Sequence, residues 1–221
     1  YRTAFAVQLG SILVGVPFIY FISKFLGNAG SGLLAEYQGN YFAFLLIGVA
    51  LIDYLSVSLT SFNSSIRENQ LMGTLEIVMM SPTSVATLVV CSSLWGFCFT
   101  TLRFLLYVFG GLALGMDLAN ANVTSAAAIL LLSIVSFSAL GILIASVTLV
   151  IKRGESLPVI VSGLSVLLGG VVFPARMLPP SLESAGQLLP FTHALHAMRR
   201  AMLQGTSIPE MLPDLRVLLL F

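Results

Sequence analysis

The sequence predicts an all-α integral membrane protein, a bundle of six transmembrane helices with an amphipathic helix on one membrane face and re-entrant helices before the last span. Hydrophobic residues make up 57% of the 221 residues and charged residues only 9%, whereas about 25% of residues are charged in soluble domains. The mean hydropathy is +1.01. Apolar runs occur along the whole chain without a soluble-looking block between them, so we expect a single transmembrane domain over residues 1–221.

The length of the apolar runs predicts the individual spans. A spanning helix needs about 20 predominantly apolar residues. Four runs reach this length, a fifth nearly does, and a sixth begins close to the end of the chain. The runs cover residues 5–26, 41–62, 85–115, 123–151, 156–173 and 210–221. We expect a trimmed polypeptide, because it lacks an initial methionine, and a truncated last span, because the sequence stops inside an apolar run.

The connections between these runs differ in character. Residues 27–40 are rich in Gly, Ser and Asn and are typical of a solvated loop. In the next connection, Ser64 and Ser65 can cap a helix that Pro82 ends. Its apolar residues recur at a helical period, on the face opposite to charged and polar ones. We therefore predict a short amphipathic helix over residues 64–81, lying along one membrane face.

Four prolines divide the other long connection into short pieces. They are Pro174, Pro179, Pro180 and Pro190. After the last of them, a helix with one apolar face runs to Gly205, a length too small to cross a bilayer. We expect residues 174–205 to form re-entrant or interfacial helices.

Two charged residues lie well inside predicted spans. Asp53 and Arg103 are functional candidates because burial of a charge in hydrocarbon is costly. They can pair across the second and third helices. The alternatives are a purely structural ion pair, or an Arg103 side chain that reaches the interface.

Pairs of small residues four apart allow close packing between membrane helices. Gly111 and Gly115 form one such pair, and Gly141 and Ala145 form another. Such pairs are common in Gly-rich membrane helices, so they are weak evidence for a dimer face.

Several function classes find no support in the sequence. No phosphate-binding loop, dinucleotide fingerprint, nucleophile elbow or zinc-protease motif is present. The net charge of +1 comes without a basic stripe, so we expect no nucleic-acid partner. His193 and His196 are three residues apart and can share a metal, but no carboxylate or cysteine ligand lies near them in sequence. We therefore predict no metal site and interpret them as polar-face residues.

The segment from Arg67 to Pro82 carries the most specific signal. It contains a Gly-Thr-Leu-Glu element and a following Ser-Pro, and Pro-punctuated residues precede the last helix. In this order of motifs the chain resembles the permease subunit of type-2 ATP-binding-cassette exporters, which move polysaccharides, lipids and drugs. The resemblance covers nearly the whole chain. In this family an amphipathic helix usually precedes the first span; because the given sequence opens almost directly into that span, we expect that its N-terminal part is trimmed.

The resemblance implies a half transporter with a cytoplasmic N-terminus in the bacterial inner membrane. Charge alone leaves this orientation open, because the predicted loops on each side of the membrane carry four Lys and Arg residues. The 64–81 helix would be a coupling helix that docks on a separate ATPase subunit, which would bind ATP and magnesium. The docking residues would be Arg67, Glu68, Gly73, Thr74, Leu75, Glu76, Ser81 and Pro82. The outer re-entrant segment would include Pro174, Pro179, Pro190 and Arg199. A second copy of the chain, or a similar permease, would complete the pathway within membrane lipid.

Three other interpretations stay open at this point. The 64–81 helix can instead rest on lipid without an ATPase partner. An intramembrane enzyme acting on lipid head groups would use His193, His196 and Arg199, and it would need no ATPase. An ion-coupled carrier would depend on Asp53.

Overall fold

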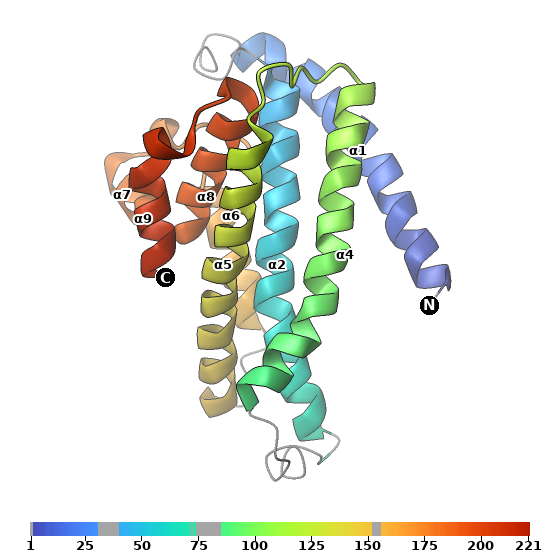
Figure 1. Ribbon diagram of the computed structural model, residues 1–221, viewed down its shortest axis with the longest axis vertical. Coiled ribbons are helices and arrows are strands. Elements are labelled where there is room, and N and C mark those ends of the chain that lie inside the picture. Colours follow the sequence, from blue (N-terminus) through green and yellow to red (C-terminus); the bar gives the residue numbers. More distant parts are fainter. Residues whose placement is uncertain (1, 31–39, 72, 74–84, 152–155) are drawn as a thin grey trace.

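The computed structural model describes residues 2–30, 40–71, 73, 85–151 and 156–221. Five helices run roughly along the long axis of the molecule (Figure 1): α1 (Arg2–Gly30), α2 (Tyr41–Leu71), α4 (Val85–Ala113), α5 (Val123–Ile151) and α6 (Leu157–Leu168). Three shorter helices, α7 (Pro180–Gln187), α8 (Pro190–Arg199) and α9 (Leu212–Leu220), gather at one end. We call this the upper end. The lower end is the one where α2 ends and α4 begins.

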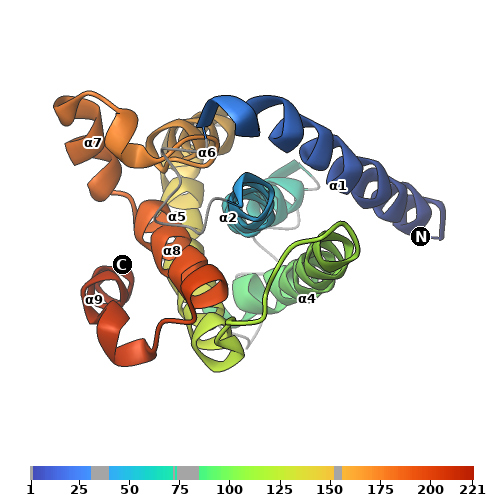
Figure 2. The ribbon, with the colours of Figure 1, turned by 90° about the horizontal axis from the view of Figure 1, so that it is seen from above.

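Helix α2 is the centre of the bundle. Seen from above, α1, α4, α5, α6 and α8 surround it (Figure 2), and it packs against each of them. Its apolar side chains are buried along most of its length, for example Phe44, Leu51 and Leu55 at 0% exposure. Burial on all sides explains why this helix is hydrophobic all round instead of being amphipathic.

The outer helices expose large apolar side chains. Phe25 on α1, Trp95 and Phe109 on α4, and Leu131 on α5 are 65–85% exposed. Within the described residues, three helices are long and apolar enough to cross a membrane, over Tyr41–Phe62, Ser93–Ala113 and Val123–Thr148. Shorter apolar stretches occupy Gly10–Phe25 and Leu157–Leu168. A surface of this kind fits hydrocarbon as its solvent, and the chain is a multi-pass membrane protein.

The structure departs from the prediction at the fifth and sixth of the runs predicted as spans. Helix α6 ends at Leu168 and not at residue 173, so its 12 residues extend only about 18 Å, less than the roughly 30 Å of a hydrocarbon core. Gly170 follows with a φ of +72°, and a Cβ there would lie 2.8 Å from the backbone nitrogen of Ala175. Only glycine permits this turn. The run at 210–221 begins with the 3₁₀ helix η5 (Ile208–Met211), and α9 starts at Leu212.

The first connection is also shorter than predicted. Helix α1 continues to Gly30 through the start of the segment that we expected to be a loop over residues 27–40. Pro17 lies inside this helix and removes one backbone donor. The third run ends as a helix at Ala113, and Gly115, with a φ of +93°, forms the turn after it.

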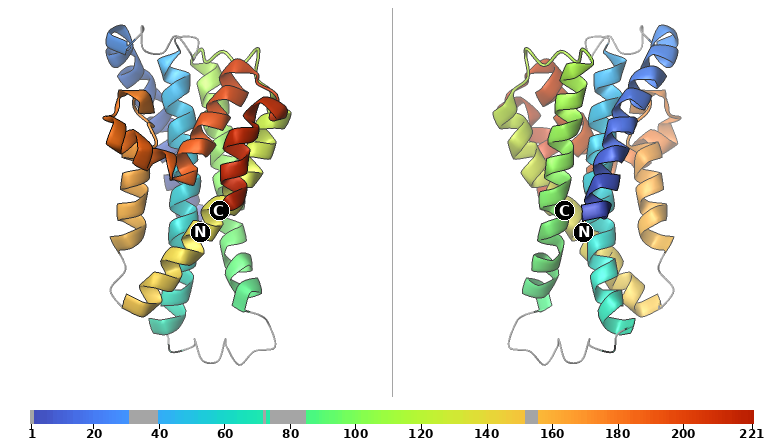
Figure 3. Two further views of the ribbon diagram at one scale, coloured as in Figure 1. Left: turned by 90° about the vertical axis from the view of Figure 1, so that its left-hand side faces the viewer. Right: turned by 90° about the vertical axis from the view of Figure 1, so that its right-hand side faces the viewer.

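The prolines of residues 174–205 begin helices, as their fixed φ favours. Pro174 precedes the 3₁₀ helix η3 (Ala175–Met177), Pro180 is the first residue of α7, and Pro190 is the first residue of α8. Helix α8 continues as the π-helix η4 (Arg200–Gln204), which Gly205 ends with a φ of +67°. In Figure 3, α8 rises to the upper end and α9 descends beside it, so neither crosses the molecule.

The small residues on α4 and α5 serve packing within the chain. Gly141 lies against the backbone of α2, where a Cβ would collide with the carbonyl oxygen of Ser58. A Cβ at Gly111 would lie 2.6 Å from Leu46 Cδ2. Both glycines therefore bring their helices close to α2.

Candidate functional site

The lower end contains the beginning of the predicted coupling helix. Helix α2 continues without a break to Leu71, so Ser64 and Ser65 do not cap a separate helix. The Ser64 hydroxyl donates instead to the Ser61 carbonyl, 3.1 Å away, within α2. The prediction of a new helix start was wrong because an N-cap residue is also tolerated inside a helix when its hydroxyl bonds back to a preceding carbonyl.

Only part of the predicted coupling segment is described. The backbone of Arg67 and Glu68 belongs to α2. Gly73 is exposed and adopts a φ of +65°, and no atom of the described residues lies within 4 Å of the Cβ position. The remaining predicted coupling residues, Thr74, Leu75, Glu76, Ser81 and Pro82, lie outside the described residues.

A charged pair lies between α2 and α4 at membrane depth. Arg103 Nη2 is 3.1 Å from Asp53 Oδ2, and both side chains are 21% exposed. The pairing that the sequence suggested is therefore present. Tyr107, one turn after Arg103 on α4, is within hydrogen-bonding reach of both charged groups.

This pair is incompletely hydrogen-bonded. Among the described residues, Asp53 Oδ2 and Arg103 Nε are buried atoms without an aligned hydrogen-bond partner. The short Nη2–Oδ2 distance is therefore a charge–charge contact with poor hydrogen-bond geometry. The attraction within such a pair offsets less of the free-energy cost of desolvating the two charges than the attraction within a bidentate pair does.

Arg199, at the end of α8, is the most buried described arginine, at 3% exposure. Its guanidinium donates to backbone carbonyls from two separate elements. Nη1 donates to Gly170 at 2.9 Å, Nη2 donates to Val171 at 2.9 Å, and Nη2 and Nε donate to Phe44 at 3.0 and 3.3 Å. The turn after α6 and the first helical turn of α2 are thus held by one side chain.

Two residues of α2 shape the space that Arg199 occupies. The guanidinium carbon lies 3.3 Å from the centroid of the Phe44 ring, a cation–π arrangement. One turn further along α2, a Cβ at Gly48 would lie 3.1 Å from Arg199 Nη2 and 2.9 Å from Val171 Cγ1. Gly48 therefore permits the close approach of the turn and the guanidinium to α2.

A second polar cluster joins α8 to α9. His193 Nδ1 is 2.8 Å from Asp214 Oδ1, and His196 Nδ1 is 2.9 Å from Asp214 Oδ2. The other ring nitrogen of His193, Nε2, lies 2.9 Å from the Gln187 carbonyl oxygen. One carboxylate thus bridges two histidines that sit one turn apart on α8.

The surroundings of His193 favour its charged form. Both ring nitrogens face acceptor oxygens, so both can donate only when the ring is protonated. The hydrogen bond to Asp214 raises the pKa of His193 above its ordinary value, burial of the ring acts in the opposite direction, and the Gln187 carbonyl adds to the rise.

Asp214 is the residue that sequence reasoning missed. It lies 18 residues after His196 in the sequence, so the search for a nearby carboxylate did not include it. The available signal was an aspartate followed by a mostly apolar run, a position at which a carboxylate needs a partner. No group of three or more His, Cys, Asp or Glu residues suited to holding a metal ion occurs within the described parts of the chain.

A family model with the description ABC-2 family transporter protein matches residues 34–221. No curated protein matches the chain.

Proposed function

Because the chain belongs to the ABC-2 family of transporter proteins, we propose that it is the membrane-spanning subunit of an ATP-driven exporter. ATP and magnesium would bind to a separate ATP-binding-cassette subunit. Two copies of this chain, or this chain and a similar permease, would assemble with two such subunits in the bacterial inner membrane. The substrate would be amphipathic or lipid-linked, such as a polysaccharide, a glycolipid or a drug.

The continuity of α2 supports this proposal most directly. The helix has 31 residues and a length of about 46 Å, whereas its apolar span, Tyr41–Phe62, has 22 residues. The last nine residues of the helix thus extend about 13 Å past the apolar part, at the lower end. This extension carries Arg67 and Glu68 in its sequence and leads to the exposed turn at Gly73.

A continuous helix can transmit movement from one end of the bundle to the other. Its lower end enters the segment that would dock on the ATPase, and its upper end holds Arg199 through Phe44. A partner that moves the docking segment would tilt α2, and Arg199 would carry the tilt to the turn after α6. This is the rigid-element coupling by which small shifts become domain movements.

The docking role of residues 64–81 rests on the resemblance in their sequence. Glu68 and Glu76 would offer negative charge to the ATPase, and Gly73 would allow a close backbone approach. Thr74, Leu75, Ser81 and Pro82 would complete the docking segment.

The decisive experiment is co-purification in mild detergent, followed by ATP hydrolysis in reconstituted bilayers. We expect an ATPase subunit to co-purify with the native chain. Glu76→Lys and Gly73→Trp should release it or uncouple hydrolysis from transport, because one reverses the charge and the other blocks close approach. Gly115→Trp is the matched control, since Gly115 also has a positive φ and an exposed position but follows α4 at the upper end.

Other outcomes favour the rival functions. If no ATPase associates with the native chain, the exporter proposal fails. Loss of an activity on lipid head groups in His193→Ala would then support an enzyme. Loss of ATP-independent transport in Asp53→Asn would support an ion-coupled carrier.

A further inference from the structure

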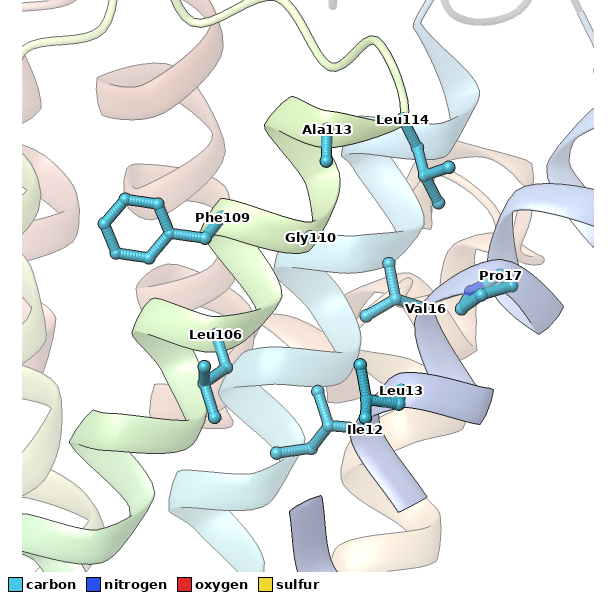
Figure 4. A pocket seen from close by; sticks show the side chains of 9 residues that line it. All are labelled: Ile12, Leu13, Val16, Pro17, Leu106, Phe109, Gly110, Ala113 and Leu114. Carbon is cyan, nitrogen blue, oxygen red and sulfur yellow. The ribbon is translucent and has the colours of Figure 1, made fainter. Parts of the chain in front are cut away.

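An apolar groove separates α1 from α4 on the side of the bundle (Figure 4). It has a volume of about 510 Å³, within the range of roughly 300–1,000 Å³ that small-molecule sites occupy. Its lining is entirely apolar: Ile12, Leu13, Val16 and Pro17 from α1, and Leu106, Phe109, Gly110, Ala113 and Leu114 from α4. Ile12 and Val16 point toward α4, and α2 lies behind the groove.

The two helices are in close contact at one point of the groove. A Cβ at Gly110 would lie 3.2 Å from Val16 Cγ1, so the glycine allows this approach. The α4 wall occupies the last part of the apolar span that ends at Ala113, on the side of the upper end. The groove therefore lies within the half of the hydrocarbon layer nearer the upper end.

A cation lies above the groove on the same edge of α1. Lys24 follows Pro17 by seven residues, which is about two turns and about 10 Å, so both occupy the same face of the helix. Lys24 is exposed, and its Nζ lies 5.0 Å from the centroid of the Tyr20 ring. Tyr20 in turn packs edge-to-face on Phe42 at a centroid distance of 5.4 Å.

The contact with Phe42 places Lys24 at the membrane interface. Phe42 belongs to the first turn of α2, where the apolar span of that helix begins. Lysine and tyrosine are among the residues that favour the boundary between head groups and hydrocarbon. The α1 edge thus presents a cation and an aromatic ring at head-group depth and an apolar groove directly below them.

We propose that this groove is a binding site for one anionic phospholipid of the adjacent leaflet. Its acyl chain lies in the groove between α1 and α4, and its phosphate group meets Lys24. Water is an unfavourable occupant of an apolar groove, and the exposed ammonium supplies a preference for a negatively charged head group.

The test is native mass spectrometry of the purified chain in mild detergent, with dioleoyl phosphatidylglycerol and dioleoyl phosphatidylcholine added at equal concentration. We expect the native chain to retain phosphatidylglycerol in preference to phosphatidylcholine. Ala113→Phe should weaken retention of both lipids, by about fourfold for each methylene displaced. Lys24→Gln should lower retention of phosphatidylglycerol alone, by about fivefold.

The control separates the groove from the general apolar surface. Ala127→Phe adds the same ring at an exposed position near the upper end of α5, and it should leave retention unchanged. Leu13→Trp fills the groove from the opposite wall at an exposed position, so it tests the site if Ala113→Phe fails to fold.

Three results would overturn the proposal. One is equal retention by Ala113→Phe and Ala127→Phe. Another is an unchanged preference for phosphatidylglycerol in Lys24→Gln. The third is a change of oligomeric state in Ala113→Phe with unaltered lipid retention, which would assign the groove to a second copy of the chain.

Discussion

Arg199 and Phe44 meet through two different interactions. The guanidinium lies over the Phe44 ring at 3.3 Å, and it also donates hydrogen bonds to the Phe44 carbonyl at 3.0 and 3.3 Å. These residues are 155 positions apart in the chain. Because the same guanidinium bonds to Gly170 and Val171, the arrangement joins α2, α8 and the turn after α6 at one point.

The first prediction concerns this junction. Arg199→Lys keeps the charge but cannot reproduce the planar fork, so buried carbonyls lose their donors. We expect a loss of roughly 3 kcal/mol in the free energy of unfolding, which is a fall of about 10 °C in Tm for a chain of this size. Thermal unfolding in detergent measures it. Arg200→Lys is the control, and an equal fall in that variant would contradict the assigned role.

A second prediction concerns the contact between α5 and α2. Gly141→Ala places a methyl group against the Ser58 backbone carbonyl, which cannot move away as a side chain can. Overpacking of this kind costs about 1–3 kcal/mol. Gly163→Ala in α6 meets no described atom within 4 Å and should be neutral or stabilising by up to about 1 kcal/mol. Equal melting temperatures for the two variants would show that α5 does not approach α2 as closely as described.

The third prediction is a pH dependence that arises from His193. Its folded-state pKa is raised by the hydrogen bond to Asp214. The stabilisation is therefore fully present below the unfolded pKa of about 6.5, and it is lost as the pH rises through the folded pKa. At pH 6 the Tm of the native chain should exceed that of His193→Gln. The expected difference is roughly 2–4 °C for each kcal/mol that His193 contributes to the free energy of unfolding.

The difference between the native chain and His193→Gln should shrink between pH 6 and pH 9. Thermal unfolding at several pH values checks this. Asp214→Asn removes the bridging carboxylate, so it should abolish the same pH-dependent difference. If the difference in Tm between the native chain and His193→Gln stays constant with pH, His193 contributes to stability only through packing.

The fourth prediction tests whether the pair of Asp53 and Arg103 has a structural or a functional role. Removal of one partner leaves an uncompensated charge at membrane depth, whereas removal of both does not. We expect Asp53→Leu and Arg103→Leu each to lower stability by roughly 2 kcal/mol, and the double variant to be more stable than either. Unfolding of the four proteins gives the coupling energy. Substrate transport by the double variant would show that the pair is structural, and loss of transport despite restored stability would show a functional role.

Sequence reasoning placed most helices well because the relevant signals are local. The run predicted at 123–151 is α5 itself, and the prolines at 180 and 190 begin α7 and α8. The errors occurred where a local signal had two meanings. Ser64 and Ser65 resemble a helix cap, yet α2 continues through them. The fifth span was predicted to reach residue 173 because residues 169–173 are apolar in character, yet α6 ends at Leu168, before Gly169 and Gly170.

The sequence by itself determined that this chain is a multi-pass helical membrane protein and which stretches are apolar helices, because hydrophobicity, proline and glycine act over a few neighbouring residues. Only the tertiary structure decided the partners of the polar groups. It brought Asp214 to His193 and His196, and Arg199 to the carbonyl of Phe44. These pairings depend on which helices pack together, and packing joins residues far apart in the chain that no local pattern connects.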